Sequence, residues 1–265
     1  MKHEFLLLSL LFLVPGVVIW HVRPDLRALM KRMALASMPF AATERLFYPE
    51  YWTPKFLFDL ADRIGFGVED VLFLAGLSAF ASTAYAVVFR RAPVPCSPPP
   101  ARPWLRAARP WLRLDRPWLR AARPWLRAAA AIAGALAAAR ALLAAGVPVL
   151  YAAVAAMMAV AAALLAARGD LLVPTVLGAL LSAAVYLGLC LVFAALVPGV
   201  FERTWRPSVL LPGRALLGVP LDEILYGLGA GFAATVFPAW AFEFRYEGGA
   251  RLFRSSALPP PARGD

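Results

Sequence analysis

The sequence predicts an all-α, polytopic membrane protein, and three observations lead to this fold class. Hydrophobic residues make up 62% of the 265 residues, well above the roughly half-apolar average of soluble domains. The mean hydropathy is +0.69. Several apolar runs approach the ~20 residues that a helix needs to cross a hydrocarbon core of ~30 Å. We therefore expect a membrane helix bundle of about seven transmembrane helices.

Seven segments have the length of a membrane span, at residues 5–22, 29–48, 69–89, 128–146, 147–167, 171–196 and 221–242. The first begins like a signal peptide, but no small-x-small cleavage site follows it, so we expect an uncleaved span. The second is the weakest, because basic residues lie at its start and Glu44 and Arg45 near its end. Arg140 in the fourth is most simply a snorkelling side chain.

Basic residues predict the orientation in the membrane. The chain has 27 Lys and Arg against 16 Asp and Glu, a net charge of +11. The surplus of basic residues lies in the first loop and between Arg90 and Arg127. If the chain has seven spans, both regions lie on the same side of the membrane. The positive-inside rule then predicts an N-terminus outside and a C-terminus inside the bacterial inner membrane. Membrane lipid, and no nucleic acid, is the expected partner of this charge.

The chain repeats itself at a constant offset of 153 residues. The shared pattern is W-x-P, then ten residues, then G-x-[GP]-[VL]-[DE]-[DE]-[VI]-L-[FY]. Such a repeat decides the predicted architecture, because each copy is one structural unit. The matching residues are Trp52, Pro54, Gly65, Val68, Glu69, Asp70, Leu72, Phe73 and Gly76 in the first copy, and Trp205, Pro207, Gly218, Leu221, Asp222, Glu223, Leu225, Tyr226 and Gly229 in the second.

The repeat predicts five regions along the chain. Two repeats of three transmembrane helices occupy 1–91 and 147–247. A linker at 92–128 and a connecting helix at 129–146 lie between them, and 248–265 is expected to be a disordered tail. Since the connecting helix adds one crossing, the two repeats are parallel, and both acidic pairs lie at the same membrane face.

Four heptads of the type RPWLRAA fill residues 102–129. A proline at every seventh position argues against one regular helix. Tryptophan beside arginine is typical of the membrane interface. We expect a linker that lies along the interface or is disordered, with a site for a specific partner as the less favoured alternative.

Two adjacent acids open the third helix of each repeat, Glu69 with Asp70 and Asp222 with Glu223. One such pair has a simple structural explanation, because carboxylates stabilise a helix N-terminus by ~0.3–1 kcal/mol. Two pairs at the same depth favour a function, since ionisable groups entering the hydrocarbon usually face the interior of a bundle.

Each acidic pair is followed by an aromatic residue four positions after its first acid, Phe73 in one repeat and Tyr226 in the other. A carboxylic acid buried beside a second one keeps its proton more readily and can donate it to an apolar substrate. An ionised carboxylate can take a proton back, and an aromatic face attracts a cation. These groups match proton-initiated carbocation chemistry on a polyene. Trp52 and Trp205 could line the same substrate, although anchoring at the interface explains them equally well.

The two motifs, RIGFGVEDVLFL and RALLGVPLDEILYG, resemble those of the small integral-membrane lycopene cyclases of bacteria, archaea and fungi. The resemblance covers about residues 5–90 and 147–247 and omits the heptads. It implies a redox-neutral closure of the ψ-end groups of lycopene, or of a related acyclic carotenoid, to ionone rings. No cofactor or metal is implied.

The resemblance also assigns the acids. Glu69 and Asp222 match the first acidic position of the family and are expected to be the primary catalytic acids. Asp70 and Glu223 are then the supporting or proton-accepting pair. Two departures are that Gly67 stands where the family has proline, and that Asp222 stands where it usually has glutamate.

Other functions stay open or are excluded. A non-catalytic carotenoid-binding subunit, or a partner of a prenyl-transferring elongase, is the main alternative, and a small transporter is a third. A homo-oligomer or a complex with other carotenoid enzymes is compatible with each. A retinal protein would need a lysine within the bundle, and histidine-rich metal sites cannot be built from His3 and His21. The run GLGAGF at 227–232 predicts helix packing rather than dinucleotide binding.

Overall fold

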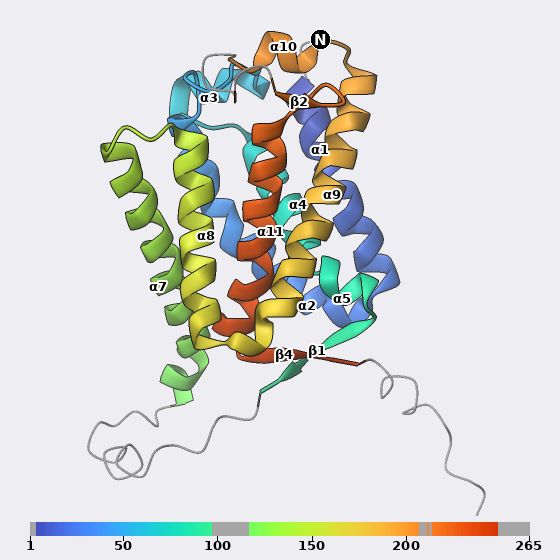
Figure 1. Cartoon of the computed structure of the whole chain (residues 1–265), viewed down its shortest axis with the longest axis vertical. Coiled ribbons are helices and arrows are strands. Elements are labelled where there is room, and N and C mark those ends of the chain that lie inside the picture. Colours follow the sequence, from blue (N-terminus) through green and yellow to red (C-terminus); the bar gives the residue numbers. More distant parts are fainter. Residues whose placement is uncertain (1–3, 97–116, 207–210, 212–213, 249–265) are drawn as a thin grey trace, which may run out of the picture.

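The computed structural model describes residues 4–96, 117–206, 211 and 214–248 of the chain (Figure 1). Long helices run alongside one another and form an upright bundle, with α7 at its periphery. Short elements cover both ends of this bundle. We name the end that carries α3, α10 and β2 the loop end, and the opposite end, which carries the two strands β1 and β4, the strand end.

The described elements follow one another along both halves of the chain. In the first half they are α1 (Glu4–Val22), η1 (Pro24–Leu26), α2 (Arg27–Ser37), η2 (Met38–Leu46), η3 (Leu57–Asp59), α3 (Leu60–Ile64), α4 (Val68–Ala81), α5 (Ala84–Val88) and β1 (Arg91–Pro95). In the second half they are α7 (Pro117–Ala144), α8 (Val149–Ala167), η4 (Gly169–Leu171), α9 (Leu172–Leu196), α10 (Val200–Thr204), β2 (Ala215–Leu216), β3 (Val219–Pro220), α11 (Leu221–Ala241) and β4 (Phe244–Gly248).

Five helices among the described residues are long and apolar enough to cross a membrane, so the chain is a membrane protein. They are Glu4–Val22, Ala122–Ala144, Val149–Ala167, Gly169–Leu196 and Leu221–Ala241. A sixth span is possible if Leu57–Ile64 and Val68–Ala81, bent by 93° against each other, count as one. The predicted helical class is therefore confirmed, whereas the predicted number of seven spans is not.

Two of the predicted spans are interrupted for local reasons. In the segment predicted at 29–48, α2 ends at Ser37 and a 3-10 helix with Pro39 in its first turn follows. Proline lacks a backbone N–H, so Pro39 cannot continue the hydrogen bonds of α2. In the segment predicted at 69–89, α4 ends at Ala81. The Ser82 and Thr83 hydroxyls there bond to the Ala79 carbonyl, an arrangement that competes with helix geometry.

The helix predicted at 129–146 begins earlier, because α7 starts at Pro117 and includes Pro124. Part of the heptad region is thus helical and packs on the strand end. The Arg127 guanidinium donates to the Glu243 carboxylate, and the Trp125 and Phe242 rings pack edge to face with their centroids 5.5 Å apart. The earlier heptads and the tail beyond residue 248 lie outside the described residues.

Two small antiparallel sheets, which the all-α prediction omitted, lie among the described residues. β1 pairs with β4, and β2 pairs with β3. The central pair of the first ladder is Pro93 with Tyr246, two residues that are 153 positions apart. At the loop end, Trp52 and Trp205 form an isolated antiparallel bridge with the same offset.

Helices α9 and α11 pack closely against each other, and α11 carries Asp222 and Glu223 in its first turn. A Cβ atom at Gly231 would lie 2.8 Å from the Ala179 Cα, and one at Gly227 would lie 2.7 Å from the Tyr186 ring. Only glycine permits this approach of the two helices. The run GLGAGF therefore packs helices, as its sequence context predicted.

Candidate functional site

The acids open two helices at the loop end of the bundle. Glu69 and Asp70 lie in the first turn of α4, and Asp222 and Glu223 lie in the first turn of α11. All four are buried. Negative charge is favoured at these positions, because the free N–H groups of a helix N-terminus carry partial positive charge.

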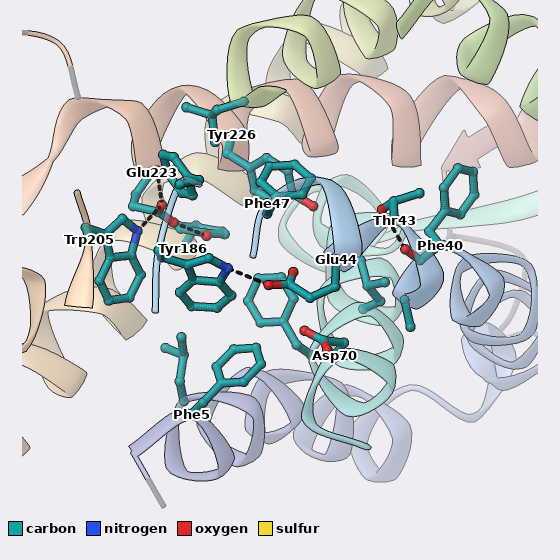
Figure 2. Close-up of a pocket in the computed structure, with 17 residues that line it drawn as sticks. Phe5, Phe40, Thr43, Glu44, Phe47, Asp70, Tyr186, Trp205, Glu223 and Tyr226 are labelled. Carbon is teal, nitrogen blue, oxygen red and sulfur yellow. Dashed lines mark hydrogen bonds between the residues drawn. The ribbon is translucent and has the colours of Figure 1, made fainter. Parts of the chain in front are cut away.

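A small cavity of about 70 Å³ collects carboxyl groups from three different elements (Figure 2). We name it the acid chamber. Its carboxyl groups belong to Glu44 of η2, Asp70 of α4 and Glu223 of α11, and most of the remaining lining is aromatic. The full lining is Phe5, Leu8, Phe40, Ala41, Thr43, Glu44, Phe47, Tyr51, Trp52, Asp70, Phe73, Leu74, Leu150, Tyr186, Trp205, Glu223 and Tyr226.

Glu223 is held by three donors. The Trp205 indole N–H donates to Oε1 at 2.8 Å, and the Tyr51 hydroxyl donates to the same oxygen at 2.6 Å. The Tyr186 hydroxyl donates to Oε2 at 2.6 Å. These bonds satisfy a carboxyl group that is only 7% exposed, as a buried polar group requires. They also fix its orientation toward the chamber.

Glu44 and Asp70 lie close together in Figure 2, on the side of the chamber away from Glu223. The Trp52 indole N–H donates to Oε1 of Glu44, and the backbone N–H of Gly67 donates to Oδ2 of Asp70 at 2.7 Å. Within the described part of the chain, each of these carboxyl groups thus accepts one hydrogen bond, against three for Glu223. Glu44 and Asp70, with one hydrogen-bond donor each, therefore lie opposite Glu223, which has three.

Glu69 and Asp222 are not among the residues that line the acid chamber. Each accepts a backbone N–H from the loop that precedes its helix, Glu69 from Leu57 at 2.6 Å and Asp222 from Leu211 at 2.8 Å. Asp222 also accepts the Tyr151 hydroxyl at 2.5 Å. In both halves the first acid therefore connects the loop to the helix start.

Gly67 stands beside Glu69 for a packing reason. A Cβ atom at this position would lie 2.4 Å from Cδ1 of Phe56 and 2.5 Å from Oε2 of Glu69. The Phe56 ring fills the space that a proline or alanine side chain would need. Oε2 of Glu69 is buried and has no hydrogen-bond partner among the described residues.

The structure brings together the four aromatic residues that the sequence suggested. Phe73, Tyr226, Trp52 and Trp205 all line the acid chamber. The two indole rings lie 5.1 Å apart. The tryptophans thus contact the acids directly, which interface anchoring alone would not require.

Among the chamber residues that the sequence did not suggest are one carboxyl group, Glu44, and two residues that bond to Glu223, Tyr51 and Tyr186. An acid near the end of a predicted span was the available signal for Glu44, because a charge there is costly unless it has a use. Tyr51 precedes the repeated Trp52 and so adjoins the motif. Tyr186 lies within an apolar run, where nothing in the sequence distinguishes it from a core aromatic.

The site contains acid-base groups rather than a recognisable metal centre. No group of three or more His, Cys, Asp or Glu side chains in the described part of the chain has the geometry to hold a metal ion. What the arrangement offers is proton transfer inside a cavity lined mostly by aromatic and aliphatic side chains.

Residues 148–241 match the family model described as lycopene cyclase. This match makes about a third of the chain similar to that family. The matched segment includes α8, α9 and α11, and with them Tyr186, Trp205 and Glu223 of the chamber. Glu44 and Asp70 come from the part of the chain that the match does not cover. Neither the curated proteins nor the solved structures gave a match to this chain.

Proposed function

We propose that the protein is a carotenoid cyclase that closes the ψ-end groups of lycopene, or of a related acyclic carotenoid, to ionone rings. The observation that carries the proposal is the meeting of three carboxyl groups in one aromatic chamber, with one of them in the segment that matches the lycopene cyclase model. Carboxyl groups supply the proton and accept it again, and aromatic faces stabilise the cation between these steps.

The reaction is balanced without a redox partner. A carboxylic acid adds a proton to the terminal double bond of the polyene, which leaves a tertiary carbocation. The next double bond attacks this cation, so that a carbon–carbon bond closes the ring and the charge moves to a ring carbon. Loss of a proton from the ring restores a double bond. Substrate and product are isomers, and the acid is regenerated.

The geometry supports a different role for each group of acids. Glu223 accepts three hydrogen bonds and is suited to stabilise the cation or accept the proton. Asp70 and Glu44, with fewer donors, are suited to deliver the proton. Glu69 and Asp222, which the sequence placed first, support the site by fixing the two loops. This order reverses the one that the family resemblance implies.

Two parallel three-helix repeats are part of the same proposal. The Trp52–Trp205 bridge at one end and the Pro93–Tyr246 pair at the other both join residues 153 positions apart. An antiparallel pair between equivalent residues is what a two-fold axis through that pair produces. These two pairs support an axis along the bundle. The distribution of basic residues favours an N-terminus outside and a strand end on the cytoplasmic side of the bacterial inner membrane.

Expression in a lycopene-accumulating bacterium tests the proposal. Chromatography of the extracted pigments should show cyclised carotenoids in cells that carry the protein in their membranes. Unchanged lycopene beside a normal amount of inserted protein would contradict the proposed activity. If that protein also retained lycopene on purification, the result would favour the alternative function, a non-catalytic carotenoid-binding subunit.

A further inference from the structure

A second, larger cavity of about 360 Å³ lies beside the acid chamber. The walls are α2, η2 and α4 on one side and α7, α8 and α11 on the other. The α7 wall uses one face of the helix and consists of Ala131, Ile132, Ala135, Leu136, Ala139, Arg140 and Leu143. From Ala131 to Leu143 this face extends ~18 Å at 1.5 Å per residue. The cavity is therefore long and runs parallel to the helices.

The two cavities share part of their walls. Phe40, Thr43, Phe47, Leu74 and Tyr226 line both of them. The acid chamber borders the long cavity near the start of α11, and the long cavity continues toward the strand end as far as Phe237. A chain that fills the long cavity thus has one end at the carboxyl groups.

The chemistry of the walls is almost entirely apolar. Arg140 is the only charged residue among the lining residues. It lies one turn from the end of α7, where an arginine side chain reaches the membrane surface. A hydrocarbon chain is therefore the occupant that these walls accept without leaving polar groups unsatisfied.

We infer that the long cavity binds the unreacted length of a linear polyene whose reacting end occupies the acid chamber. This inference rests on the proposed function and adds to it the path of the substrate. A chamber of about 70 Å³ holds only an end group, so the remainder of a carotenoid needs an adjoining apolar space. The polyene then lies along the bundle, with its tail toward the strand end.

The walls also indicate where the polyene enters. Leu46 of η2 and Leu136 of α7 both line the cavity, and each is 46% exposed. The α7 helix lies at the periphery of the bundle, and few of the residues between Ala122 and Ala144 are buried. A carotenoid dissolved in the bilayer reaches the cavity sideways, between η2 and α7, without passing through water.

Cavity-filling substitutions test the inference. Ala135→Phe on α7 and Ala153→Phe on α8 project a ring into the cavity, because both alanines line it. Ala137→Phe and Ala155→Phe are matched controls, since these alanines are exposed on the same helices and are not among the lining residues. Each variant is produced as the full chain in lycopene-accumulating cells. After purification in detergent, total carotenoid, cyclised or not, is measured per mole of protein.

The expected result is about tenfold less bound carotenoid for Ala135→Phe and Ala153→Phe than for wild type, with both controls unchanged. Equal retention by all four folded variants would overturn the inference and leave the proposed cyclase activity standing. Membrane-lipid acyl chains in place of carotenoid in the wild-type protein would overturn it as well. Retention that depends on Ala135 and Ala153, without any cyclised product, would support the binding path and contradict the cyclase activity.

Discussion

Trp52 and Trp205 pair across an antiparallel bridge, and each donates its indole N–H to a different carboxyl group of the acid chamber. The first holds Glu44 and the second holds Glu223. The loops of the two halves thus meet at one point and orient two acids from there. The repeated tryptophan is therefore a positioning residue for the carboxyl groups as well as a part of the chamber wall.

Trp205→Phe should keep the ring packing and lose the hydrogen bond to Glu223. A hydrogen bond to a charged group contributes ~1.5–3 kcal/mol, so the rate of ring formation should fall about 10- to 100-fold. Pigment chromatography over a time course measures this rate. Trp125→Phe, on α7 at the strand end, serves as the control and should leave the rate unchanged. An unaffected rate in Trp205→Phe would argue against the positioning role.

The acids that face the chamber should matter more than those that hold the loops. Asp70→Asn and Glu223→Gln should reduce ring formation by about 10²- to 10⁴-fold, the usual contribution of general acid–base groups. Glu44→Gln should lower it in the same direction. The readout is the ratio of cyclised carotenoid to lycopene at equal protein in the membrane.

Glu69→Gln and Asp222→Asn provide the comparison within the same motifs. Both should retain ring formation at a reduced level while lowering the melting temperature in detergent, because they weaken the bonds to Leu57 and Leu211. Full loss of ring formation in these two variants, with activity in Asp70→Asn and Glu223→Gln, would restore the order that the family resemblance implies.

Gly67→Ala should destabilise the first acidic helix start. The added Cβ meets Cδ1 of Phe56 at 2.4 Å, and overpacking of this kind costs about 1–3 kcal/mol. The melting temperature in detergent should fall and be partly restored in the Gly67→Ala, Phe56→Ala double variant. Gly188→Ala is the control, because nothing lies within 4 Å of its Cβ position. Additive effects of Gly67→Ala and Phe56→Ala would mean that the clash is not the cause.

The Arg23–Asp25 pair should make stability depend on pH. The Arg23 guanidinium bonds both oxygens of Asp25, at 2.9 and 2.8 Å, and lowers the pKa of this carboxyl below its usual range. A lowered pKa in the folded state stabilises the protein above the ordinary pKa of ~3.9, and this contribution is lost as the pH falls. Asp25→Asn should therefore melt below wild type at about pH 6, and the difference should shrink toward about pH 3. A difference that is constant over this range would contradict the assignment.

The sequence was sufficient to locate the helix starts, but not to decide which acid of each pair faces the chamber. Glu69 and Phe73 are four residues apart and share a helix face, as do Asp222 and Tyr226. The chamber instead receives Asp70 with Phe73 and Glu223 with Tyr226, which are three apart. Both spacings place side chains on one face, so the rotation of the helix against its neighbours decides between them.

Glu44 shows the other limit of the sequence. Hydropathy treated residues 29–48 as one weak span, whereas Pro39 divides the segment into α2 and a 3-10 helix. The 3-10 helix carries Glu44 into contact with Trp52, a residue eight positions later in the chain. Such a contact depends on where the chain turns, which periodicity does not encode. Large-scale features such as the repeat and the apolar helices are encoded, because each rests on many residues.

Solvent deuterium is the most direct test of proton-initiated ring closure in the acid chamber. Purified protein, equilibrated in D₂O and held in excess over lycopene, should give a product that carries one deuterium for each ring formed. The label enters because the carboxyl group that protonates the terminal double bond has exchanged with the solvent. Mass spectrometry of the cyclised carotenoid measures it, and Glu223→Gln should give little product. A ring-containing product without deuterium would contradict the account.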